Sequence, residues 1–287
     1  MRRTRCAWAG VVCAAVVAAG CLDKASRPDA PVRARSFGPT SPPAEGVYID
    51  HVLIEQPVGD PFLNRELWSV GPAAAPPSVT ALLAENGLRA SVIGGNLPPK
   101  FQALVGSEPD TVNARRFVFG SAKEHVVPTA GPTDPCTFDL LTDLAGKRTQ
   151  VTLRQARSGV MVRPEATADR RIKVWCEPQI QHGERQEYLR PTADATQFVM
   201  QGEVPTERYT GLGFEAALGP NEYLVIGWSA DESANLGSAM FGVEAAGRKR
   251  QRVLVIRAGQ LGGGPTDLPA IPTAHRRPSV AAEASKR

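Results

Sequence analysis

The residue with the most specific chemistry in this chain is Cys21, which follows a positively charged start and an apolar run over residues 7–19. The small residues Ala18, Ala19 and Gly20 come directly before its thiol. A basic first segment, an apolar segment too short to span a bilayer, and small residues at its end are typical of a secretory signal peptide. The pattern therefore predicts export, with a cysteine thiol at the cleavage point.

Ala-Gly-Cys after such a run resembles the lipobox, the signal of bacterial lipoproteins. The resemblance implies that residues 1–20 form the signal peptide and that Cys21 becomes the first residue, with its thiol bearing a diacylglycerol and further acyl chains such as palmitate. The membrane is then a partner through this lipid, and the cell envelope is the expected location. Leu22 is not acidic, which favours the outer membrane, at its periplasmic face or the cell surface. An ordinary signal peptide cleaved nearby and an uncleaved anchor are the alternatives.

Two further thiols, Cys136 and Cys176, remain once Cys6 and Cys13 have left with the signal peptide. In an oxidising compartment such a pair is predicted to form a disulfide. The closed loop of roughly forty residues would stabilise the fold by about 3–4 kcal/mol. Two separate buried thiols are the alternative. A zinc site would need histidine partners, and His182 alone lies close downstream, so no metal site is predicted.

No catalytic constellation is found among the histidines or serines. The chain has no His-Glu-x-x-His helix, no Gly-x-Ser-x-Gly elbow and no Ser-x-x-Lys. Each histidine is expected to be a surface residue with its hydrogen bonds satisfied; the four are His51, His125, His182 and His275. We therefore predict no enzyme activity, no catalytic residues, no cofactor and no small-molecule ligand.

Two weaker patterns concern sugars. Paired carboxylates can hydrolyse glycosides, but no spacing here favours that role over a surface position or a helix cap. The carboxylates considered are Asp50, Glu55, Asp60 and Glu66. A platform for sugar rings could be lined by Trp68, Trp175 and Trp228, although core packing is the favoured interpretation.

The charge of the exported chain is nearly balanced, with thirty basic and twenty-nine acidic residues once the signal peptide is removed. From Arg248 onward nine residues are basic and two are acidic. We expect this basic end to be solvated; contact with anionic lipid, polysaccharide or an acidic partner is the alternative. Nucleic-acid binding is not expected, because the protein is predicted to be exported to the cell envelope and because no aromatic residues lie between the arginines.

Proline-rich segments flank the ordered body. Residues 21–46 are predicted to be a disordered tether and residues 259–287 a disordered basic tail. Between them, residues 47–114 are predicted to form a small α+β unit and residues 115–258 a β-rich region.

Local patterns place the elements of this body. Residues 47–54 and 88–93 are predicted strands, and residues 78–86 a helix with Ser78 as its N-cap. A short helix is predicted to begin at Pro98-Pro99. After residue 115, short β-patterned runs separated by proline and glycine predict antiparallel sheets packed like a sandwich. The fold class is therefore α+β, with a mainly antiparallel β-sandwich-like region.

Two resemblances concern this body. The runs 159–164, 171–178 and 219–227 resemble part of the β-domain of bacterial secretins over about seventy residues. Gly59–Trp68 and Pro220–Tyr223 are among the landmarks that make the chain similar to uncharacterised lipoproteins of planctomycete-type bacteria. The first resemblance implies an envelope or secretion-system protein as partner, and the second implies no specific activity.

Together, these patterns predict a lipid-anchored envelope protein with a non-catalytic scaffolding, assembly or secretion-associated role. An envelope hydrolase acting on glycan or ester is one alternative. A glycan-binding module is the other.

Overall fold

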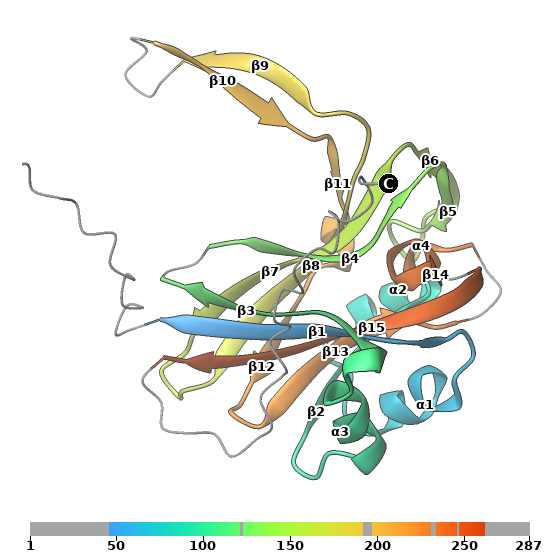
Figure 1. Cartoon of the computed structure of the whole chain (residues 1–287), viewed down its shortest axis with the longest axis vertical. Helices are drawn as coiled ribbons and strands as arrows, with labels where there is room; N and C mark the ends of the chain where they lie inside the picture. Colours follow the sequence, from blue (N-terminus) through green and yellow to red (C-terminus); the bar gives the residue numbers. More distant parts are fainter. Residues whose placement is uncertain (1–45, 121–122, 192–196, 231–233, 246, 262–287) are drawn as a thin grey trace, which may run out of the picture. The chain divides into compact units, whose positions relative to one another are not determined.

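The computed structural model describes one continuous body of antiparallel strands with short helices (Figure 1). The residues that it describes are 46–261, with gaps at 121–122, 192–196, 231–233 and 246. Its strands form two larger sheets and two separate hairpins. The predicted fold class, α+β with a mainly antiparallel sandwich-like region, is confirmed.

The first sheet has β1 and β15 at its centre, paired antiparallel along their lengths. Its strands, in spatial order, are β2 (Leu88–Gly94), β13 (Glu222–Trp228), β15 (Arg248–Gln260), β1 (Val47–Pro57) and β3 (Thr111–Phe119), with β14 (Gly242–Ala245) also paired to β15. The two central strands carry buried residues on both faces, because apolar side chains at odd and at even positions enter different cores.

The second sheet is built on the long β7–β8 pair. Its strands, in spatial order, are β11 (Thr206–Arg208), β8 (Ile172–Gln181), β7 (Ala156–Ala166) and β4 (His125–Thr133), with β12 (Phe214–Leu218) also paired to β8. β8 shows the predicted alternation, since Ile172, Val174 and Cys176 are buried whereas Lys173 is exposed.

Two hairpins and several short helices complete the body. The hairpin strands are β5 (Cys136–Leu140) with β6 (Thr149–Leu153), and β9 (Gln186–Pro191) with β10 (Phe198–Glu203). The helices are α1 (Pro61–Asn64), α2 (Pro77–Glu85), α3 (Pro99–Val105) and α4 (Leu236–Phe241), with 3-10 turns η1 (Glu66–Ser69), η2 (Glu108–Asp110) and η3 (Thr210–Leu212).

Two apolar cores hold the two larger sheets and the helices together. Ile49 and Leu53 of β1 pack in one core with β7 and β8, so this core joins the two sheets. Val52 and Ile54 of the same strand pack in the other, together with residues of α1, η1 and α3. The first sheet is therefore covered on one face by the second sheet and on the other by helices.

The predicted elements of residues 47–105 are confirmed as β1, α2, β2 and α3. The predicted cap Ser78 is wrong, because Pro76 holds the N-cap position and Ser78 lies in the first turn of α2. The helix ends at Asn86, whose buried side chain donates to the Leu82 oxygen at 2.9 Å and to the Leu141 oxygen at 2.8 Å. Asn86 thus stops the helix and ties it to the chain that follows β5.

The boundary predicted near residue 114 does not separate two sheets. β1 and β2 come from the first predicted region, yet they pair with β15 and β13 from the second. Five of the nine basic residues counted from Arg248 belong to β15, so this part of the basic end is a strand of the first sheet. The predicted signal peptide 1–20 and nearly all of the tether and tail lie outside the described residues.

Candidate functional site

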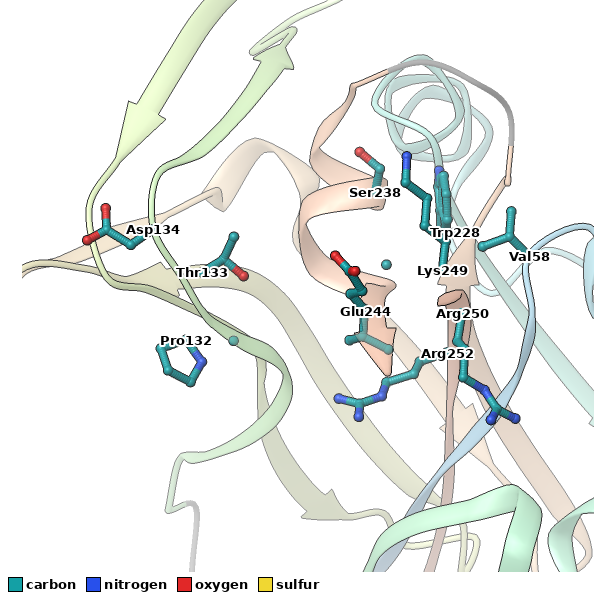
Figure 2. A pocket seen from close by; sticks show the side chains of 13 residues that line it. Val58, Pro132, Thr133, Asp134, Trp228, Ser238, Glu244, Lys249, Arg250 and Arg252 are labelled. Atoms are coloured by element: carbon teal, nitrogen blue, oxygen red, sulfur yellow. The ribbon is translucent and has the colours of Figure 1, made fainter. Parts of the chain in front are cut away.

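A pocket of about 610 Å³ lies between the end of β4 and the strands β14 and β15. Figure 2 shows Pro132 and Thr133 on one side of it and Trp228 and Lys249 on the other. Small-molecule sites usually have volumes of about 300–1,000 Å³. The pocket is therefore large enough to be a candidate binding site.

Two guanidinium groups in this pocket share one carboxylate. Arg252 donates from Nε to Glu55 Oε2 at 2.9 Å and from Nη1 to the Thr129 oxygen at 2.7 Å. Arg250 Nε lies 3.2 Å from Glu55 Oε1. Because Arg250 and Arg252 are two residues apart on β15, their side chains leave the strand on the same face. Strand alternation thus brings both guanidinium groups to the carboxylate of β1.

An indole forms one wall of the pocket. The Trp228 residue is 8% exposed, and its Nε1 is buried with no hydrogen-bond partner among the described residues. Helix α4 packs closely over this ring, since a Cβ on Gly237 would come within 2.9 Å of the indole Cδ1. Leaving a buried donor unpaired costs about 1–3 kcal/mol. The indole N–H is therefore a buried, unpaired donor beneath α4, and it is the indole ring that lines the pocket.

The β9–β10 hairpin presents a second candidate site, an exposed apolar face. Its register pairs Leu189 with Met200 and Pro191 with Phe198, which puts these four side chains on one face. Leu189, Phe198 and Met200 are 62%, 69% and 65% exposed. We call these four residues the apolar hairpin face.

The opposite face of this hairpin is mostly polar, with Val199 as its exposed apolar residue. The Tyr188 hydroxyl donates to the Glu203 carboxylate, and the Arg190 guanidinium lies 5.5 Å from the centroid of the Tyr188 ring. Within the described part of the chain, β9 and β10 pair only with each other (Figure 1). Each strand therefore keeps one free edge, next to an apolar face that nothing described covers.

The first of the considered carboxylates, Asp50, belongs to a buried ion cluster. It accepts from Arg116 Nη2 at 2.8 Å and from Arg257 Nη2 at 2.7 Å. The side chains of Asp50 and Arg257 are each only 5% exposed. This carboxylate is therefore committed to neutralising two guanidinium groups within the fold.

The other three carboxylates considered for glycoside hydrolysis lie apart from the Asp50 cluster. Asp50 and Glu55 pair with residues 257 and 252 of β15, one odd and one even, so they lie on opposite faces of β1. Asp60 caps α1 by accepting from the Leu63 N–H at 2.9 Å, and Glu66 is exposed in η1. Asp50 and Glu55 therefore do not form the facing pair of carboxylates that glycoside hydrolysis requires.

The expectation of a satisfied surface histidine is wrong for His51, which is fully buried. His51 stacks on Phe117 with 5.4 Å between the ring centroids, and His125 lies against the same ring at 3.7 Å. Neither ring nitrogen of His51 has a hydrogen-bond partner among the described residues. Burial, with smaller contributions from nearby charges, lowers the pKa of His51 to about 4. His182 pairs with Glu207 at 3.4 Å, and His275 lies outside the described residues.

The three tryptophans considered as a sugar platform are not brought together. Trp68 packs on the helical side of the first sheet and donates from Nε1 to the Leu63 oxygen at 2.7 Å. Trp175 is half-buried on β8 of the second sheet. Trp228 belongs to the core between the sheets, so it alone of the three lines the pocket described above.

Cys136 and Cys176 are free, buried cysteines rather than the expected disulfide. They lie on different strand systems, since Cys136 begins the β5–β6 hairpin and Cys176 is central in β8. Both side chains pack into the core between the sheets. Burial raises the pKa of each thiol. The arrangement matches the alternative of two separate buried thiols.

Sequence reasoning missed both candidate sites. The charge pattern predicts Arg250 and Arg252 only as part of a basic end, although their two-residue spacing is the signal of a strand face. Residues 197–200 are one of the β-patterned runs predicted after residue 115, but the pairing that gathers Leu189 and Phe198 on one face depends on the hairpin register. The predicted lipid-attachment residue Cys21 lies outside the described residues.

Among the residues that the structure describes, no helix is both long and apolar enough to cross a membrane. The same residues include no cluster of three or more histidine, cysteine or carboxylate side chains suited to hold a metal ion. Comparison of the chain with protein-family models, curated proteins and solved structures finds no match.

Proposed function

We propose that this protein is a lipid-anchored envelope protein with a non-catalytic assembly role, and that it binds a partner protein through the apolar hairpin face. The observation that carries the proposal is the exposure of Leu189, Phe198 and Met200 on one face of a hairpin that pairs with no other described strand. The secretin resemblance makes an envelope or secretion-system protein the favoured partner.

The anchor is supported by the sequence around Cys21. Burial of acyl chains contributes about 0.8 kcal/mol per methylene, so two or three chains on one cysteine hold a protein stably at a membrane. The proline-rich residues that follow would separate the folded body from the bilayer. The membrane is thus the first partner, through the lipid on Cys21.

The hairpin requires a second partner for a physical reason. An isolated two-stranded hairpin is at best marginally stable in water, and burial of a large apolar side chain is worth about 1.5–3 kcal/mol. Covering Leu189, Phe198 and Met200 would therefore stabilise both the hairpin and the complex.

Among a second copy, a lipid surface and another protein, a protein with an apolar groove fits the apolar hairpin face best. The apolar hairpin face offers on the order of 400 Å², about half of what each side buries in a stable complex, so two copies face to face would bury too little. A lipid surface is disfavoured by charge, because residues 184–203 include four acidic and two basic residues. A groove that also pairs with the free strand edges would supply the remaining contacts.

The contact is tested by affinity purification of the detergent-solubilised protein. We expect Met200→Glu to lose a protein that the wild type recovers, because it places a charge in the middle of the apolar hairpin face. Val199→Glu is the matched control, since Val199 is adjacent, 48% exposed and on the opposite face. Retention of the same proteins by both variants would show that this face is not the contact.

The anchor and the absence of catalysis are tested separately. Cys21→Ser should abolish labelling by a palmitate analogue and move the protein from the membrane to the soluble fraction. A wild type that takes up no label would contradict the anchor. Labelling of the wild type by a serine- or glycosidase-directed probe would instead support the hydrolase alternative.

A further inference from the structure

We propose that the pocket between β4, β14 and β15 binds a small hydroxylated acid, with its carboxylate or phosphate group held by Arg250 and Arg252. This site is independent of the apolar hairpin face and goes beyond the proposed assembly function. The inference rests on the charges, the hydrogen-bond donors and the walls of the pocket.

The floor of the pocket, which Arg250 and Arg252 form beside Glu55, has an excess of positive charge. Arg250 and Arg252 both pair with Glu55, so one carboxylate faces two guanidinium groups. The Glu55 side chain is 10% exposed, and those of Arg250 and Arg252 are 32% and 22% exposed. Charges in such partly buried positions interact more strongly than in bulk water. An incoming anion would neutralise the remaining charge.

Each of the two carboxylates that line the pocket has a cation nearby. Asp134 lies 3.4 Å from Arg154 Nη1, outside the floor. Glu244 stands directly opposite Lys249 in the β14–β15 register. Each of these carboxylates thus has a cation near it, and the excess stays at Arg250 and Arg252.

Donors are free for the anion. A guanidinium has five N–H groups in a planar fork that matches carboxylate and phosphate oxygens. Arg252 uses three of its nitrogens on Glu55 and the Thr129 oxygen, which fixes its plane and leaves two N–H groups. Arg250 donates from Nη2 to the backbone oxygen of Glu55 at 3.3 Å, and its Nη1 forms no hydrogen bond within the described residues. The guanidinium group of Arg252 is therefore held in position before a ligand binds.

The walls suit the organic body of such a ligand. The indole of Trp228 faces the segment of Pro132 and Thr133 across the pocket (Figure 2). The carboxylates of Asp134 and Glu244 line the same space and can accept hydrogen bonds from hydroxyl groups. The combination of a cationic floor, an aromatic wall and carboxylate acceptors fits an acid that also carries hydroxyls.

The test is calorimetric titration of the full mature chain in detergent with three probes: glucuronate, inorganic phosphate and glucose, at constant ionic strength. We expect glucuronate or phosphate to bind at least about tenfold more tightly than glucose, because only these probes carry an oxyanion. A preference for glucuronate would identify a carboxylate ligand, and one for phosphate a phosphorylated ligand. Equal binding of glucose, or no binding of either anion, would overturn the proposal.

Variants locate the anion. Arg250→Gln should weaken binding of the preferred anion about tenfold or more, since it removes a charged donor. Arg163→Gln is the control, because Arg163 is a half-exposed arginine of β7 that pairs with Glu124 at 3.5 Å and does not line the pocket. An equal loss in both variants would overturn the assignment. If Arg250→Gln does not fold, wild-type affinity must fall with added salt, and an affinity unchanged by salt would contradict an oxyanion site.

Discussion

We expect acid to destabilise this protein through His51, which is buried between the two sheets. Its ring stacks on Phe117, and neither of its nitrogens has a hydrogen-bond partner among the described residues. Burial is the largest cause that lowers its pKa to about 4, followed by the positive charges of His125 and Arg115, whereas Asp50 raises it. The charged imidazole is therefore disfavoured in the folded state.

The direction of the pH dependence follows from this pKa. In the unfolded chain a histidine binds its proton near pH 6.5, whereas folded His51 binds it near pH 4. The unfolded chain therefore holds more protons between these values, and stability falls as the pH drops. The stability that comes from keeping His51 uncharged in the folded protein is fully present above about pH 6.5. The pKa difference corresponds to about 3 kcal/mol, of which about 2.5 kcal/mol is lost by about pH 4.5.

The measurement is urea unfolding of the wild type and His51→Phe at about pH 7 and about pH 4.5, followed by tryptophan fluorescence. Phenylalanine keeps a ring against Phe117 but cannot bind a proton. We expect the wild type to lose about 2.5 kcal/mol more than this variant between the two pH values. His182→Gln, at a surface ion pair with Glu207, should behave like the wild type. Equal losses in the wild type and His51→Phe would refute the reasoning.

Three further results are expected. Asn86→Ala should lower the free energy of unfolding by about 2–4 kcal/mol, because it leaves buried backbone groups of the chain after β5 without partners; a loss below about 1 kcal/mol in urea would contradict this. Asp50→Ala should cost about 3–5 kcal/mol, since it leaves the buried Arg257 charge unpaired, and an unchanged urea midpoint would argue against the cluster. A thiol reagent should count two free thiols, Cys136 and Cys176, in the unfolded mature domain without reductant, whereas a count of zero would establish the bridge.

Much of the local structure could be predicted because its signals lie within a few residues. The run of apolar residues from Val47 predicts β1, and proline pairs followed by apolar residues predict α3. α4 was missed because it is a single short segment, with its N-cap Asn235 as the main signal. A cap alone does not distinguish such a turn from a loop.

The candidate sites could not be predicted because each depends on pairing between distant residues. Glu55 meets Arg252 only when β1 pairs with β15, 197 residues further along the chain. That pairing also explains why a run of basic residues is part of a sheet, since Glu55 and Asp50 neutralise charges that would otherwise keep β15 in water. The sequence shows the charges of this strand but not their partners.

The central claim is that the apolar hairpin face binds a partner protein in the envelope. The most direct measurement places a photo-crosslinking amino acid at Phe198, on the apolar face, and in a separate variant at Val199, on the opposite face, in intact cells. We expect a discrete protein adduct from position 198 and a much weaker one from position 199. Adducts of equal yield from both positions, or none from position 198 in a membrane-bound protein, would contradict the claim.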